Sequence, residues 1–208
     1  MVKGKAFDTR LVHSGPDPKS QKGVVNTPVH RASTVIFPTV QAMKDAEKIK
    51  YDTTYYGVHG TPSTFALEEA MADVEDGYRA VSVSSGLAAI TTALITYLEA
   101  GDHLLMVDSV YGPTRNFCNT TLKRFGIETT YYDPLIAGDI EALIRPKTKV
   151  IFTESPGSYT FEIQDIPAIT EVAHKYNIKV MIDNTWSAGH FFKPFDHGVD
   201  ISLQATTK

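Results

Sequence analysis

The strongest constraint on the fold is a repeated alternation of short apolar runs with amphipathic segments, which begins near residue 79. Six runs have the length and composition of strands: 81–83, 103–107, 127–131, 149–153, 179–182 and 201–203. The spacing of apolar side chains between them predicts helices over 87–97, 113–125, 139–144 and 165–176. Strands that alternate with helices indicate an α/β fold with a mostly parallel sheet covered by helices.

Residues 1 to about 60 differ from the rest, because glycine and proline recur there and apolar periodicity is poor. An irregular arm of this length would be unstable alone, so we expect it to pack on another body such as a second subunit. Thr61 and Pro62 are typical of a helix start, with Thr61 as the N-cap. The predicted organisation is an N-terminal arm over 1–60 and a large domain over 61–208.

Bulk properties exclude several classes of protein. The chain has 208 residues and a net charge of −4 with no basic block, so nucleic acid is a poor candidate for a partner. No apolar stretch approaches the roughly 20 residues that cross a bilayer, and the segment Met1–Lys5 does not begin a signal peptide. A single cysteine, Cys118, excludes an internal disulfide and favours a reducing cytoplasm. The histidines show no metal-ligand spacing, so we expect no metal site.

An aspartate and a lysine close two successive apolar runs. Asp183 follows Val180-Met181-Ile182, and Lys208 follows the run 201–203 after a short polar segment. A turn aspartate and a surface lysine are the common alternatives. Together, however, they are what a pyridoxal phosphate enzyme needs. The carboxylate holds a proton on the ring nitrogen, and the amine forms a Schiff base with the cofactor aldehyde.

Other polar or aromatic residues follow the predicted strands, where ligands bind in open parallel sheets. Ser85-Gly86-Leu87 begins a predicted helix, whose free N–H groups suit a phosphate, although such a pair is often only a turn and a cap. The hydroxyls of Thr206 and Thr207 are further candidates to bind that phosphate. Tyr111 could stack on a planar ring, although taken alone it is more often a packing residue.

An ordered set of motifs runs along nearly the whole chain. They are Tyr55-Tyr56-Gly57, Gly60-Thr61-Pro62, Ser85-Gly86-Leu87-Ala88-Ala89, Gly101-Asp102-His103, Tyr111-Gly112, Glu154-Ser155-Pro156-Gly157-Ser158, Ile182-Asp183-Asn184-Thr185-Trp186 and Gln204-Ala205-Thr206-Thr207-Lys208. Together they resemble the Cys/Met-metabolism family of fold-type I pyridoxal phosphate enzymes. The resemblance implies a PLP-dependent transferase-like fold with a large domain of the aspartate aminotransferase type.

The resemblance also implies a role for each matching residue. Lys208 would hold the cofactor covalently, and Asp183 would pair with the pyridinium nitrogen. Tyr111 would stack on the ring and assist proton transfer. The residues implied in phosphate binding are Gly86, Leu87, Thr207 and, from a neighbouring subunit, Tyr56. The implied assembly is a catalytic dimer within a homotetramer.

The implied activity is that of a carbon–sulfur lyase of methionine biosynthesis, which splits L-cystathionine by β-elimination into homocysteine, pyruvate and ammonia. Ser158 favours this β-acting branch, because many γ-acting relatives carry asparagine there. The alternatives are a γ-acting relative (cystathionine γ-lyase or γ-synthase, methionine γ-lyase, O-acetylhomoserine sulfhydrylase) and an inactive cofactor-binding fragment.

Two departures from the family pattern matter. Val58 stands where the family commonly has an arginine, so a charge-assisted phosphate contact is missing, and His59 could replace it. Family members also continue for roughly as many residues again. That portion holds a smaller C-terminal domain and the arginine that binds the substrate carboxylate, so this chain looks like an N-terminal portion.

Overall fold

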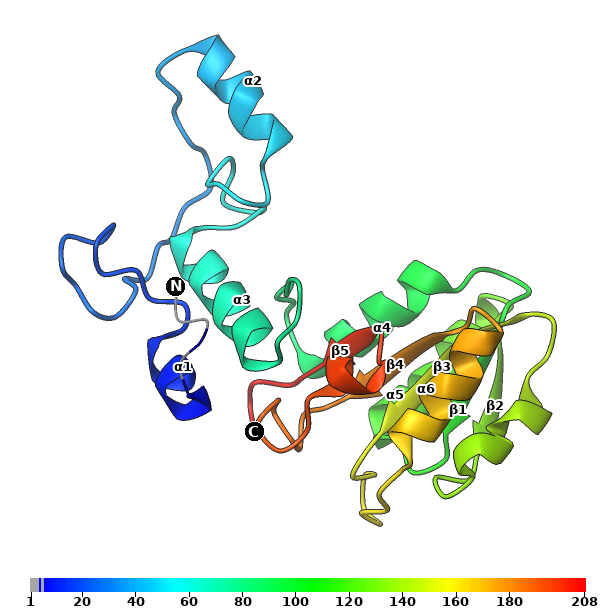
Figure 1. The fold of residues 1–208 in the computed structure, drawn as a ribbon. Helices are drawn as coiled ribbons and strands as arrows, with labels where there is room; N and C mark the ends of the chain where they lie inside the picture. Colours follow the sequence, from blue (N-terminus) through cyan, green and yellow to red (C-terminus); the bar gives the residue numbers. More distant parts are fainter. Residues whose placement is uncertain (1–3, 5) are drawn as a thin grey trace. The chain divides into compact units, whose positions relative to one another are not determined.

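The computed structural model describes residue 4 and residues 6–208, and these divide into two compact units. The first unit extends to Ser82, and the second runs from Val83 to Lys208 (Figure 1). The second unit contains a five-stranded sheet in the order β2-β1-β3-β4-β5, with every neighbouring pair parallel. Its strands are β1 (His103–Val107), β2 (Glu128–Tyr132), β3 (Thr148–Glu154), β4 (Lys179–Asp183) and β5 (Ile201–Leu203).

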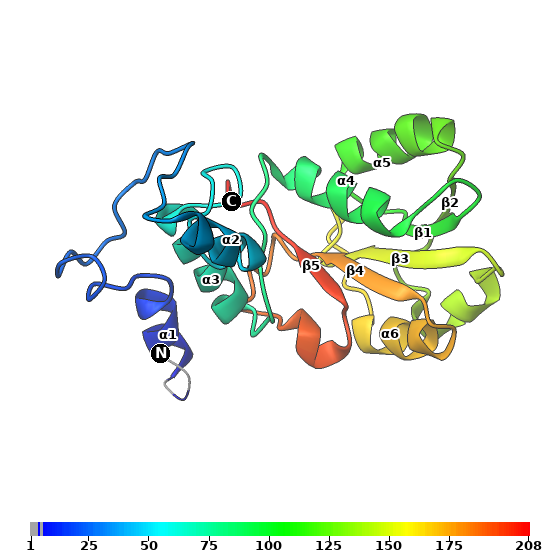
Figure 2. The same ribbon diagram turned by 90° about the horizontal axis from the view of Figure 1, so that it is seen from above.

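Helices cover both faces of this sheet. They are α4 (Gly86–Tyr97), α5 (Gly112–Phe117) with the π-helical turn η1 (Cys118–Leu122), the 3-10 helix η2 (Ala137–Leu143), α6 (Ile166–Lys175) and the 3-10 helix η3 (Pro194–His197). Figure 2 shows α4 and α5 on one face of the sheet and α6 on the other. Because both faces are covered, the middle residues of the central strands are apolar, and all five residues of β1 are buried.

The hydrophobic core lies between this sheet and its helices. Its largest fully buried side chains include Phe152 of β3, Met106 of β1 and Leu94 of α4. Burial of one such side chain contributes about 1.5–3 kcal/mol, so the sheet and its helices supply most of the stability of the second unit.

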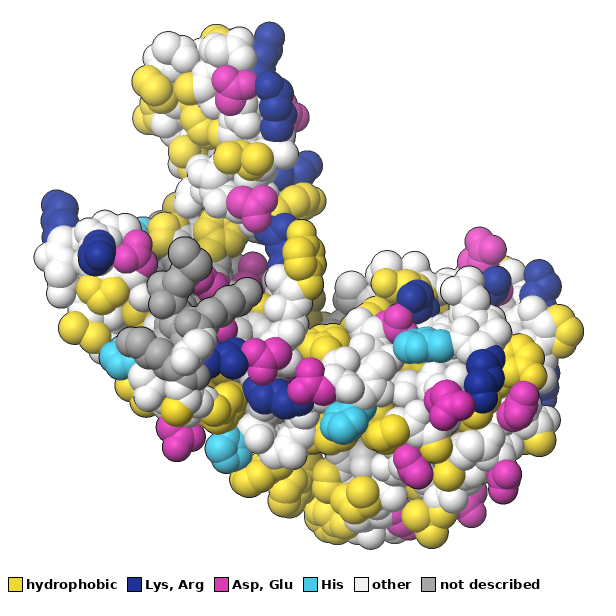
Figure 3. Space-filling view, in the orientation of Figure 1, with side chains coloured by type: hydrophobic (Ala, Val, Ile, Leu, Met, Phe, Trp, Pro, Cys, Tyr) yellow, Lys and Arg dark blue, Asp and Glu magenta, His cyan; other side chains and the backbone are white. Residues whose placement is uncertain are grey.

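The first unit contains three helices: α1 (Phe7–His13), α2 (Val40–Lys48) and α3 (Pro62–Val74). The Arg10 guanidinium of α1 binds Asp73 and Asp76 at the end of α3, with Nη2–Oδ1 distances of 3.1 and 2.5 Å. In the described part of this unit, no large hydrophobic side chain is buried. Figure 3 shows hydrophobic side chains at the surface around α2, where Ile36, Val40 and others are exposed.

The fold class predicted from the sequence is confirmed, and most elements lie where the pattern places them. Strands β1 and β5 match their predicted ranges. Strands β2, β3 and β4 differ from their predicted ranges by one residue at one or both ends. Pro62 opens α3 with Thr61 at the N-cap position, and the Asp165 carboxylate caps α6 by accepting the Ala168 N–H at 3.1 Å. The helix predicted over 113–125 is partly π-helical, and that over 139–144 is the 3-10 helix η2.

Two sequence predictions are wrong. Residues 81–83 form no strand, because the Ser82 N–H and hydroxyl both donate to the Glu68 carboxylate, at 2.8 and 2.9 Å, rather than to a neighbouring strand. Residues 1–60 are not irregular throughout, since they contain α1 and α2. Neither helix buries a residue, and each is shorter than ten residues, so a pattern within a stretch rich in glycine and proline is easily missed. The division into an arm (1–60) and a large domain (61–208) stays a prediction.

In the part of the chain that the structure describes, no helix is long and apolar enough to cross a membrane.

Candidate active site

The candidate site lies at the carboxyl edge of the sheet, where parallel strands all end on the same side. The strand register places Glu154, the last residue of β3, beside Asp183, the last residue of β4. Asp183 in turn pairs with Leu203, the last residue of β5. The segments that follow these strands therefore begin next to one another, at the edge where open α/β sheets bind ligands.

Asp183 presents a largely desolvated carboxylate at this edge. Its Oδ1 accepts the Thr185 N–H at 3.0 Å. Burial raises the pKa of Asp183 above its ordinary value, although the hydrogen bonds from Thr185 oppose this shift. A nearby cation favours the charged form of a desolvated carboxyl group. Asp183 therefore suits the nitrogen of a protonated pyridine ring.

Hydrogen bonds hold the segment after β5 against the segment after β4. The Asn184 N–H donates to the Leu203 carbonyl at 2.8 Å, and the Ala205 N–H donates to the Thr185 hydroxyl at 2.9 Å. The chain then continues to Thr207 and Lys208, whose side chains are exposed. The Asp183 carboxylate and the Lys208 amine therefore lie on two segments that are hydrogen-bonded to each other.

The N-terminus of α4 packs against the same segment. The Ser85 hydroxyl caps the helix by accepting the Ala88 N–H at 3.1 Å. Gly86 allows close packing, because a Cβ at this position would lie 2.6 Å from the Ala205 Cβ. The unpaired N–H groups around Gly86 and Leu87 thus lie near the residues that lead to Thr207, which suits a bound phosphate.

Tyr111 lies in the loop after β1, with its side chain 43% exposed. Its backbone N–H donates to the Glu154 Oε2 at 2.7 Å. The ring is therefore exposed while its backbone is held to the end of β3, which suits a residue that stacks on a planar ligand.

Glu154 is a member of this edge to which the sequence pattern gives no role beyond its place in a motif. Its Oε1 accepts the Ser158 hydroxyl, and its Oε2 accepts the Tyr111 N–H. Burial raises its pKa to about 7, with a further increase from the nearby Asp183 and opposing hydrogen bonds from Ser158 and Tyr111. Apart from that motif, the sequence signal was a glutamate at the end of an apolar run, which by itself is not distinctive.

Tyr56, predicted to bind the phosphate of a neighbouring subunit, belongs to the first unit. Its exposed ring meets His59 edge-on, with 6.1 Å between ring centroids. The His59 ring also lies near the rings of Tyr51 and Tyr55, with 5.6 and 5.9 Å between ring centroids. Val58 is exposed. The role of Tyr56 stays a prediction, as do the roles of the other site residues.

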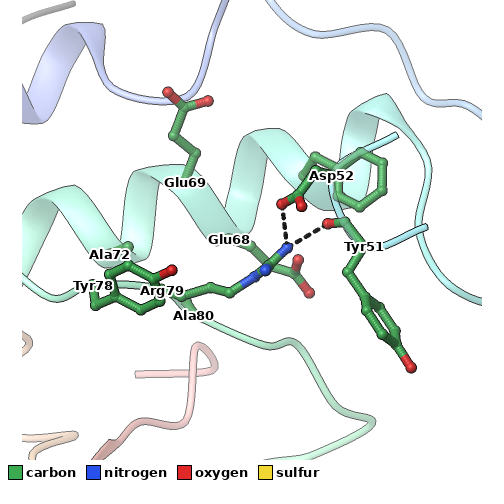
Figure 4. Close-up of a pocket in the computed structure, with 9 residues that line it drawn as sticks. Tyr51, Asp52, Glu68, Glu69, Ala72, Tyr78, Arg79 and Ala80 are labelled. Atoms are coloured by element: carbon green, nitrogen blue, oxygen red, sulfur yellow. Dashed lines mark hydrogen bonds and ion pairs between the residues drawn. The ribbon is translucent and has the colours of Figure 1, made fainter. Parts of the chain in front are cut away.

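Two hollows in the surface contain none of the predicted site residues. The first, of about 280 Å³, lies in the first unit, where Arg79 binds the Asp52 carboxylate and the Tyr51 carbonyl at its wall (Figure 4). The second, of about 540 Å³, lies in the second unit and includes Asp108 and Asp133. Among residue 4 and residues 6–208, no group of three or more histidine, cysteine, aspartate or glutamate side chains could hold a metal ion.

The residues of the second unit fit pyridoxal phosphate. Gly86 allows a helix N-terminus to approach the chain that leads to Thr207 and Lys208. On the same edge, Asp183 is a desolvated acceptor for the ring nitrogen, and Tyr111 exposes an aromatic face. This set provides an anion site, a carboxylate, an amine and a stacking surface, the four groups that the cofactor requires.

Comparisons with known proteins agree with this chemistry. A Rhizobium johnstonii protein is 51% identical over 208 residues, which cover 100% of this chain and 52% of that protein. The cystathionine beta-lyase of Haemophilus influenzae is 44% identical over 205 residues, which cover 97% of this chain and 52% of that enzyme. The metY crystal structure from Campylobacter jejuni, which contains N'-pyridoxyl-lysine-5'-monophosphate, has a TM-score of 0.89 and 28% identity, covering 99% of this chain and 50% of that one.

The chain thus spans about half the length of these relatives. The family described as Cys/Met metabolism PLP-dependent enzymes matches residues 8–208, which include every predicted site residue. A match of this extent, on a parallel sheet whose carboxyl edge suits the cofactor, means that the chain belongs to the Cys/Met metabolism family of PLP-dependent enzymes.

Proposed function

We propose that the whole protein is a carbon–sulfur lyase of methionine biosynthesis, which splits L-cystathionine by β-elimination. The observation that carries this proposal is the carboxyl edge of the sheet, where the desolvated Asp183 carboxyl lies on a segment fastened to the one that ends in Lys208. The 44% identity to the Haemophilus influenzae cystathionine beta-lyase supports the choice of substrate.

Pyridoxal phosphate, when bound, supplies a ring that takes up the negative charge left on the substrate after loss of its α-proton. In the proposed site, Asp183 pairs with the ring nitrogen and keeps it protonated. Tyr111 stacks on the ring. Gly86, Leu87 and Thr207 bind the phosphate through backbone N–H groups and a hydroxyl.

Lys208 is the proposed catalytic base. Its amine would hold the cofactor, and when free it would accept the α-proton of the substrate. The Cβ–S bond breaks, and homocysteine leaves as the thiol after it receives a proton. Water converts the remaining three-carbon fragment into pyruvate and ammonia.

The arm over 1–60 is proposed to contact a neighbouring subunit, so that Tyr56 reaches the phosphate bound there. The exposed apolar side chains of the first unit support this arrangement, because another surface must cover them. A dimer would then be the catalytic unit within a homotetramer. The single cysteine, buried and free, supports a cytoplasmic location.

The length of the chain favours a second candidate, a cofactor-binding portion that is inactive by itself. The chain covers only 52% of the Haemophilus influenzae enzyme, so the remaining half of such a protein could hold groups that the reaction needs. This candidate predicts that the 208-residue chain binds pyridoxal phosphate and releases no product from any thioether substrate.

The test is an assay of the protein at its natural length with L-cystathionine. Pyruvate and homocysteine are expected as products, whereas 2-oxobutyrate would show a γ-acting enzyme. Lys208→Ala should abolish product formation and the visible absorption band of the bound cofactor. Lys175→Ala is the matched control, because this exposed lysine forms an ion pair with Glu171 on the surface of α6. Normal lyase activity in Lys208→Ala would overturn the proposed mechanism.

A further inference from the structure

Two loops at the carboxyl edge are held together by one buried carboxyl group. The loop after β1 carries Tyr111, and the loop after β3 carries Ser158. The Glu154 carboxyl bridges them, because Oε2 accepts the Tyr111 N–H at 2.7 Å and Oε1 accepts the Ser158 hydroxyl. The Ser158 N–H completes the connection by donating to the Ser109 carbonyl at 2.8 Å.

The burial of Glu154 makes this bridge unusual. The residue is only 7% exposed. In the described part of the chain, no lysine, arginine or histidine forms an ion pair with it. A buried carboxyl group without a cation is costly, so its hydrogen bonds to the two loops are what keep it in place.

The packing of the two loops leaves little freedom for Tyr111. A Cβ on Gly157 would lie 2.3 Å from the Ser109 hydroxyl oxygen, so the Gly157 backbone packs directly against the Ser109 side chain. The end of β3 is itself fixed, because the Gln164 amide donates to the Glu154 carbonyl at 2.7 Å and accepts the buried Tyr132 hydroxyl at 3.0 Å. A rigid strand end therefore holds the backbone of an exposed aromatic residue.

We propose that Glu154 is a positioning residue that sets the Tyr111 ring against the cofactor by holding the Tyr111 backbone N–H. Glu154 acts through Tyr111 and does not need to touch the cofactor. This inference rests on the proposed function, since it assumes that Tyr111 stacks on pyridoxal phosphate. It predicts that the effect of Glu154 on cofactor binding depends on the presence of the Tyr111 ring.

A double-mutant cycle on the protein at its natural length tests this dependence. The dissociation constant of pyridoxal phosphate is measured by absorbance titration of the apoprotein, for the wild type, Glu154→Ala, Tyr111→Ala and the double variant. Glu154→Ala is expected to weaken binding about tenfold, in the range expected when a buried N–H loses its acceptor. In the Tyr111→Ala background the same change is expected to weaken binding less than about twofold, because no ring remains to be positioned.

Conservative variants separate positioning from general damage to the fold. Glu154→Gln should bind the cofactor within about threefold of the wild type, because an amide oxygen can still accept the Tyr111 N–H. Glu154→Asp, one methylene shorter, should behave like Glu154→Ala, and it replaces that variant in the cycle if alanine prevents folding. Glu171→Ala, on the exposed face of α6, is the control and should bind the cofactor normally.

Equal weakening by Glu154→Ala with and without the Tyr111 ring would overturn the proposal, and so would unchanged binding in Glu154→Ala. Both outcomes can be told from a failure of the proposed lyase activity, because cofactor binding is measured without substrate. A wild type that binds pyridoxal phosphate but releases no pyruvate from L-cystathionine would overturn the lyase and leave the cycle intact.

Discussion

The two units of this chain reach their folds by different means. The second unit buries its apolar side chains around a parallel sheet, with Phe152 and Met106 fully enclosed. In the described part of the first unit, no large apolar side chain is buried, and its helices α1 and α3 are joined by polar contacts such as that of Arg10 with Asp73. Partly exposed ion pairs contribute about 0–1 kcal/mol, much less than a buried core. The second unit is therefore stabilised mainly by its own core, whereas the described part of the first unit has no comparable core.

The prediction with the largest effect concerns one residue from each unit, Lys208 of the second and Tyr56 of the first. Lys208→Ala is expected to lower lyase activity about 10²–10⁴-fold, the usual range for loss of a catalytic base. Tyr56→Ala should also be nearly inactive at limiting cofactor. Coexpression of the two variants should restore roughly a quarter of the wild-type activity, because half of the dimers are mixed and each mixed dimer keeps one intact site.

Pyruvate release and the subunit composition of the purified mixture measure this complementation. If the mixture is no more active than Tyr56→Ala alone, Tyr56 does not act in a neighbouring subunit. In that case the arm would lose its proposed role, and the contrast between the two units would be one of stability only.

The next prediction compares a matched pair of apolar truncations. Phe152→Ala, in the centre of β3 and 0% exposed, is expected to lower the free energy of unfolding by about 3–5 kcal/mol. In the monomeric chain, where the proposed subunit contact is absent, Ile36→Ala, at a residue that is 94% exposed, should change it by less than about 0.5 kcal/mol. Urea denaturation of both variants at one protein concentration checks the difference. Comparable losses would contradict the view that only the second unit has a core.

The same contrast explains which parts of the fold the sequence could predict. Strand β1 was predictable to the residue, because both faces of the sheet are covered and His103–Val107 is buried throughout. Residues 81–83 have an equally strand-like composition, but the Ser82 N–H donates to Glu68, 14 positions away in the chain. Helix α2 has a regular apolar face that includes Val40 and Met43, but it is only nine residues long and lies in a stretch where glycine and proline recur, so the pattern was overlooked.

The candidate site was predictable only where a residue's place in the chain reveals its chemistry. Asp183 and Lys208 follow apolar runs, so their position beyond strand ends can be read directly from the sequence. Glu154 follows such a run too, but its partner is the backbone N–H of a residue 43 positions earlier. A hydrogen bond to a distant backbone group leaves no pattern in the sequence, so only the structure could show it.

The buried Glu154 carboxyl predicts how stability depends on pH. Its pKa is raised from 4.5 to about 7, mainly by burial, so the folded state holds this proton between those values while the unfolded state releases it. The folded state thus binds more protons there, and the free energy of unfolding should fall as the pH rises from 4.5 to 7. The loss should reach at most about 3 kcal/mol, at about 1.4 kcal/mol for each pH unit.

Glu154→Gln should lack this trend, and urea denaturation of both proteins from pH 4 to 8 measures the difference. Asp45→Asn is the control in the first unit, because a hydrogen bond from Lys48 lowers the pKa of Asp45 and gives the opposite sign. If the difference in the free energy of unfolding between the wild type and Glu154→Gln does not change with pH, Glu154 titrates as an ordinary glutamate.

The smallest predicted effect concerns the phosphate contact of the arm. If His59 replaces the arginine that the family commonly carries at the Val58 position, His59→Phe should weaken cofactor binding several-fold, since one hydrogen bond typically contributes a net of about 0.5–1.5 kcal/mol. Phenylalanine keeps the ring that packs against Tyr51, Tyr55 and Tyr56, so it tests the imidazole nitrogens alone.

His59→Ala removes both the nitrogens and the ring. Equal loss in the two variants would assign the effect to phosphate binding, whereas loss in His59→Ala alone would assign it to packing of the tyrosines in the first unit. Val58→Arg adds the missing cation and should tighten binding in either case, because Val58 is exposed and can accept a longer side chain. Failure of Val58→Arg to tighten binding would mean that this part of the arm does not reach a phosphate.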